Sequence, residues 1–113
     1  HHLRFGDGSN FENETRTNAI LREIALRLSD LPANVGLLVI GYADDSGVPA
    51  ANETVSLGRA EIVSAHLRGL GVSPRRLVTV GRSNENRISQ ETGRNSANRR
   101  VEIELIFLQA DLP

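Results

Sequence analysis

The feature that most constrains the fold is an unbroken apolar run, GLLVIG, from Gly36 to Gly41. A run of this length without polar alternation is typical of a central strand that is covered on one or both faces. In the sequence it is flanked by two segments whose apolar residues recur every three or four positions, which predicts amphipathic helices. A buried strand between two such helices predicts a sheet with helices packed on it.

The first helix is predicted over residues 14–30 and ends before Pro32, because proline disfavours helical geometry in the residue before it. Its apolar face is expected to consist of Ile20, Leu21, Ile24, Leu28 and Leu31.

The second helix is predicted from Asn52, which can cap it by accepting a backbone N–H, to Leu70, where Gly71 stops it. Gly47 and Pro49 are expected to keep the preceding loop, residues 42–51, out of regular structure. The buried stripe of this helix is expected to be Leu57, Ala60, Val63, Leu67 and Leu70.

Three further strands are predicted, at residues 3–5, 77–81 and 100–108, and residues 82–96 are predicted to be mainly loop. In the last strand Glu102 and Glu104 fall on one face, and the opposite face carries Val101, Ile103, Leu105 and Phe107. The predicted class is α+β, an α/β sandwich of order β-α-β-α-β-(turn)-β with helices packed on one mixed four-stranded sheet.

A chain of 113 residues fits a single domain, which we place at residues 3–110. His1 and His2 are interpreted as a tag remnant. No apolar run approaches the ~18 residues of a membrane span, so we expect no membrane contact by this domain and an anchor outside this segment.

Composition argues against several classes of function. The chain contains no cysteine, which excludes thiol catalysis and cysteine-ligated zinc. A net charge of −1 and 4% aromatic residues argue against nucleic-acid binding. His66 is interpreted as a surface residue, and with no second His or Cys outside the tag remnant, a metal site has little support. No catalytic residues, metal or cofactor are predicted.

Two opposite charges stand out around the central strand. Asp44 follows the strand in an acidic loop, and Arg59 lies on the helix that comes next. Taken alone, the pair could form an internal salt bridge. Asp45 is interpreted as a solvated loop carboxylate. For Arg94 and Arg100, ion pairing with helix or loop carboxylates and a functional role are both left open.

The sequence GYADDSG, then Asn52, then Arg59-Ala60, and later GRNSANRRVEIEL resembles the OmpA-like C-terminal domain family, which includes the peptidoglycan-associated lipoprotein and the periplasmic part of flagellar motor protein B. The resemblance covers about residues 35–108. The commoner family loop reads G-H-T-D, so Tyr42 and Ala43 stand here in place of His and Thr.

The resemblance implies a periplasmic, cell-wall-associated domain that binds peptidoglycan non-covalently and anchors a larger envelope protein. The recognised group is the diaminopimelate of the stem peptide. By the same resemblance the ligand-binding residues are Asp44, Arg59, Asn52, Ser46 and Arg99.

The chemistry of the ligand suits such a pair of charges. The end of diaminopimelate carries an ammonium and a carboxylate on one carbon, so a carboxylate and a guanidinium on opposite walls satisfy both. Arginine grips a carboxylate with two parallel hydrogen bonds. Asn52, Ser56 and Arg59 are three or four residues apart and therefore share one helix face.

Two alternatives from other classes remain. A degenerate OmpA-like fold could serve as a structural or protein-interaction module without wall binding. An enzyme acting on the wall would need an acid and base or a metal, and the sequence offers neither set. The oligomeric state is left open, with a homodimer as one option.

Overall fold

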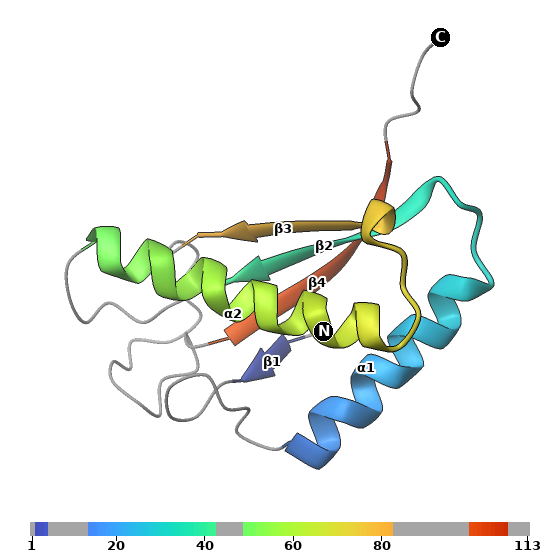
Figure 1. Ribbon diagram of the computed structural model, residues 1–113, viewed down its shortest axis with the longest axis horizontal. Helices are drawn as coiled ribbons and strands as arrows, with labels where there is room; N and C mark the ends of the chain where they lie inside the picture. Colours follow the sequence, from blue (N-terminus) through green and yellow to red (C-terminus); the bar gives the residue numbers. More distant parts are fainter. Residues whose placement is uncertain (1, 5–13, 43–48, 83–99, 109–113) are drawn as a thin grey trace, which may run out of the picture.

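The computed structural model describes residues 2–4, 14–42, 49–82 and 100–108. The elements are β1 (His2–Arg4), α1 (Glu14–Ser29), β2 (Val35–Gly41), α2 (Pro49–Gly69), the 3-10 helix η1 (Pro74–Arg76), β3 (Leu77–Gly81) and β4 (Arg100–Phe107). Within these residues four strands form one sheet in the order β1-β4-β2-β3 (Figure 1). Strands β2 and β3 are parallel, whereas β4 is antiparallel to both of its neighbours. The predicted mixed α+β architecture is confirmed.

Both helices pack on the same face of the sheet. Val39 of β2 is opposite Ile103 of β4, and strand alternation places Leu37 and Val101 on that face as well. These four side chains share one core with α1 and α2. The residues contributed by the helices and the segment after α2 are Leu21, Ile24, Leu28, Ala60, Val63, Leu67 and Val72.

Hydrogen bonds fix the segments that follow both helices. Gly71 has a φ of 98°, and the N–H groups of Gly71 and Val72 bond back to Arg68 and Leu67, which is a Schellman ending for α2. Beyond α1, the Arg76 guanidinium donates to the carbonyl oxygens of Pro32 and Val35 at 2.8 Å each and of Leu31 at 3.3 Å. The predicted stop at Gly71 is confirmed.

Helix α2 begins earlier than the sequence predicts. It starts at Pro49, so Asn52 lies in its first turn and is not the cap. Proline is well suited to the first helical position, because its missing N–H would have no helical partner there and its φ is already helical. The expectation that Pro49 belongs to an irregular loop was therefore wrong.

The buried stripe of α2 also differs from the prediction. Ala60, Val63 and Leu67 are buried as expected, but Leu57 is 38% exposed and Leu70 is 41% exposed. Ser56 and Ser64 take the buried positions next to the sheet. Their small size fits a helix that approaches the strands closely, as described below.

Strand β4 is only partly covered. Val101 and Ile103 are buried, whereas Leu105 and Phe107 on the same face are 65% and 83% exposed. The shared core of helices and sheet extends along β4 only as far as Ile103. No helix in the described segments has the length and apolar character needed to cross a membrane.

Candidate functional site

The two parallel strands end in paired glycines, Gly41 and Gly81, which are opposite one another in register. Helix α2 lies directly on this pair. A Cβ at Gly41 would overlap the carbonyl oxygen of Ser56, and one at Gly81 would lie 2.6 Å from the Leu57 nitrogen. Only glycine at both strand ends therefore permits this close approach, which brings α2 to the carboxyl end of β2.

Arg59 lies one turn after Ser56 and is carried to the same end of the sheet. Its side chain is 6% exposed, and Nη1 donates a hydrogen bond to the Tyr42 carbonyl oxygen at 3.3 Å. Tyr42 is the first residue after β2. The guanidinium predicted to bind the ligand is thus buried at the carboxyl end of β2, where the loop that carries Asp44 begins.

Tyr42 is held from a second side by Arg100, the first residue of β4. The Tyr42 N–H donates to the Arg100 carbonyl oxygen at 2.8 Å, and the Arg100 guanidinium carbon lies 4.1 Å from the centroid of the tyrosine ring. Nε and Nη2 of Arg100 both lie 2.6 Å from Oε2 of Glu102. Arg100 therefore forms a cation–π contact and an ion pair at once, at 1% exposure.

The remaining predicted ligand residues are not placed by the structure. Asp44, Ser46 and Arg99 lie outside the described residues, as does Arg94. For Asn52 the structure describes the backbone, within the first turn of α2, but not the side chain. Of the predicted site, the structure therefore describes the cationic group, the Arg59 guanidinium, with Ser56 buried beside it.

Sequence reasoning missed the roles of Tyr42 and Arg100. Arg100 forms an ion pair with Glu102 on its own strand, a partner that the sequence analysis did not name. The spacing of two within a strand placed both side chains on one face and could have indicated the pair. Both apolar strands also end in glycine, LLVIG and LVTVG, and that repetition was the signal for the close helix contact.

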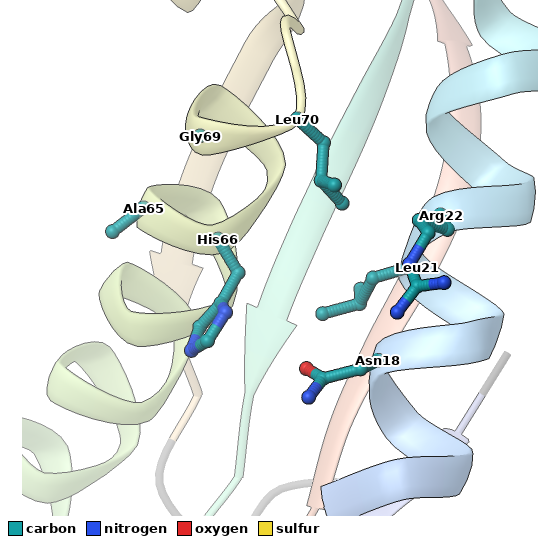
Figure 2. A pocket seen from close by; sticks show the side chains of 7 residues that line it. All are labelled: Asn18, Leu21, Arg22, Ala65, His66, Gly69 and Leu70. Atoms are coloured by element: carbon teal, nitrogen blue, oxygen red, sulfur yellow. The ribbon is translucent and has the colours of Figure 1, made fainter.

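A separate cleft of about 500 Å³ lies between the two helices (Figure 2). It is lined by Asn18, Leu21 and Arg22 of α1 and by Ala65, His66, Gly69 and Leu70 of α2. His66 is exposed, as predicted, and lies seven residues after Arg59, about 10 Å further along the helix axis. Arg59, the predicted ligand residue whose side chain the structure describes, does not line this cleft. Among the described residues no group of three or more His, Asp or Glu side chains could hold a metal ion.

Comparison with known proteins agrees with this architecture. The OmpA family model matches residues 5–100. Outer membrane protein A of Bordetella avium is 39% identical over 72 residues, which are 62% of this chain and 37% of that protein. The chain thus spans little more than a third of the length of this curated relative.

Solved structures with the same fold include the peptidoglycan-associated lipoprotein of Burkholderia pseudomallei, with a TM-score of 0.81 at 23% identity over 93% of this chain and 89% of that one. The C-terminal domain of MotB from Helicobacter pylori gives a TM-score of 0.71 at 26% identity, over 83% and 74% of the two chains. These relatives are cell-envelope proteins, and the localisation predicted for this domain, the periplasm, agrees with them. With a family model matched over most of its length and the same fold in these relatives, the chain belongs to the OmpA family.

Proposed function

We propose that this domain binds peptidoglycan non-covalently through the diaminopimelate of the stem peptide and so anchors a larger envelope protein to the cell wall. It acts as a binding domain and not as an enzyme. In this proposal Arg59 binds the carboxylate at the end of diaminopimelate and Asp44 binds the neighbouring ammonium. Asn52, Ser46 and Arg99 complete the contacts with the peptide.

The observation that carries the proposal is the position of Arg59. Its guanidinium is buried at the carboxyl end of β2 and bonded to the Tyr42 carbonyl, two residues before Asp44. In any conformation of the loop, covalent geometry keeps the Cα atoms of Tyr42 and Asp44 within about 7 Å. A cation and an anion are thereby confined to one region, as a ligand with both charges on one carbon requires.

Tyr42 is one of the two residues at which this chain departs from the commoner family loop, and its backbone and ring are both held in place. Tyr42, which replaces the usual histidine, is 2% exposed and is held by Arg59 on its carbonyl and by Arg100 on its N–H and ring. This bracing favours a functional loop over a degenerate one.

Titration of the domain with a muropeptide that contains meso-diaminopimelate tests the proposal. We expect micromolar to millimolar affinity, because two or three shielded charged hydrogen bonds of about 1.5–3 kcal/mol each must offset the cost of association. Asp44→Ala removes the anion, and Arg59→Lys keeps a cation but removes the fork that grips a carboxylate. Each should weaken binding by about tenfold or more.

Arg68→Ala is the matched control, because Arg68 is an exposed arginine on the same helix, more than two turns beyond Arg59. It should bind like the unaltered domain. If Asp44→Ala and Arg59→Lys fold and also bind like the unaltered domain, the proposed site is wrong. If the unaltered domain stays in solution when whole sacculi are sedimented, the degenerate interaction module is the better description.

A further inference from the structure

The contacts around Tyr42 connect two buried arginines that approach it from different elements. Arg59 reaches its carbonyl oxygen from α2, and Arg100 reaches its ring and N–H from β4. Tyr42 is the only residue among these three whose backbone leads directly into the Asp44 loop. Any displacement of Tyr42 would therefore move both the loop origin and the acceptor of Arg59.

Burial makes the Arg100 arrangement costly unless its charge is well compensated. A guanidinium at 1% exposure has lost its hydration, and such a group is stable only when it is paired and hydrogen-bonded. Glu102, at 17% side-chain exposure, supplies the opposite charge, and the tyrosine ring supplies a face for the cation. The ring of Tyr42 therefore lies against a guanidinium that is itself held by Glu102. The backbone N–H and carbonyl of Tyr42 are held at the same time by Arg100 and Arg59.

We propose that Arg100 is a positioning residue for the ligand site: by stacking on Tyr42 it holds the carbonyl that orients the Arg59 guanidinium. The role rests on the proposed function of Arg59 as a carboxylate-binding group. Arg100 itself does not touch the ligand. Its effect passes through Tyr42, which makes this tyrosine, and not only the charged pair, a determinant of affinity.

The proposal predicts different results for two changes at one position. Tyr42→Phe keeps an aromatic face for Arg100, whereas Tyr42→Leu removes it while retaining the backbone carbonyl. We expect Tyr42→Leu and Arg100→Gln to lower the affinity for the diaminopimelate muropeptide by about tenfold, and Tyr42→Phe to change it less than about twofold. The Nε–Hε signal of Arg59 in a ¹H–¹⁵N spectrum of the unliganded domain should shift in the first two variants and stay unchanged in Tyr42→Phe.

A second comparison separates positioning from general loss of structure. In an Arg59→Lys background, Arg100→Gln should lower affinity less than about twofold further, because the group that it positions is already altered. An equal loss in both backgrounds would contradict the proposal, as would an unmoved Arg59 signal in folded Tyr42→Leu. Where Arg100→Gln does not fold, the two Tyr42 variants decide the result. If the unaltered domain binds no muropeptide, the proposed function fails, while the Arg59 signal still tests whether Arg100 and Tyr42 position that side chain.

Discussion

Gly41 at the end of β2 lies against the backbone of α2, and a Cβ at this position would overlap the carbonyl oxygen of Ser56. Backbone cannot move aside as a flexible side chain can. We predict that Gly41→Ala lowers the free energy of unfolding by about 1–3 kcal/mol or more, since overpacking forces the helix away from the sheet. Urea unfolding monitored by circular dichroism measures the change, and a stability within about 0.5 kcal/mol of the original would show that the contact is easily relieved.

Gly58 offers the opposite case on the same helix. It lies in the interior of α2, and apart from its chain neighbours and the nearby backbone of its own helix, a Cβ there would meet no atom of the described residues within 4 Å. We expect Gly58→Ala to raise the free energy of unfolding by about 0.5–1 kcal/mol, because alanine restricts the unfolded chain and favours the helix. A destabilised Gly58→Ala variant in the same urea experiment would contradict this reading of the helix surface.

The sequence predicted the order of elements and most of the core because periodicity reports which face of each element is apolar. Ala60, Val63 and Leu67 were placed correctly for this reason. Periodicity does not report how near two elements come. The prediction therefore placed Leu57 in the stripe, whereas contact at the paired glycines puts the small side chain of Ser56 beside the strands. Leu70, which was also predicted in the stripe, lies after the last residue of α2 and is 41% exposed.

The same distinction applies to the ligand site. Family resemblance identified Arg59, and its burial at the carboxyl end of β2 is compatible with that assignment. The supporting contacts of Tyr42 with Arg100 depend on antiparallel pairing between strands almost sixty residues apart, which a single sequence does not specify. Long-range register places Arg100, the last residue of the NRR triplet, against Tyr42.

A hydroxyl pair joins α2 to β3. Ser64 Oγ and Thr79 Oγ1 are 2.8 Å apart, and Ser64 is 4% exposed. Ser64→Ala and Thr79→Val should each cost about 1 kcal/mol of unfolding free energy, since each leaves the other hydroxyl poorly satisfied. The double variant should cost less than the sum, and a double-mutant cycle on urea unfolding measures this coupling. Strictly additive losses would mean that the two hydroxyls do not act as a pair.

Arg76 connects the end of α1 to the start of β2 through hydrogen bonds to the carbonyls of Leu31, Pro32 and Val35. Arg76→Ala should lower the free energy of unfolding by about 1–3 kcal/mol, because hydrogen bonds from a charged donor are lost together. Its neighbour Arg75 is exposed and makes a suitable control, for which alanine should change stability by less than about 0.5 kcal/mol. Equal effects of the two substitutions in thermal unfolding would rule out a specific role for Arg76.

The most direct test of the central claim compares two muropeptides that differ at one residue of the stem, meso-diaminopimelate or lysine. Lysine retains the ammonium but lacks the carboxylate on the same carbon, so the proposed contact with Arg59 cannot form. Calorimetric titration should show affinity for the diaminopimelate peptide at least about tenfold higher, corresponding to roughly 1.4 kcal/mol, and Arg59→Lys should remove most of this difference. Equal affinity for both peptides, or a difference that persists in Arg59→Lys, would contradict recognition of a doubly charged group at this site.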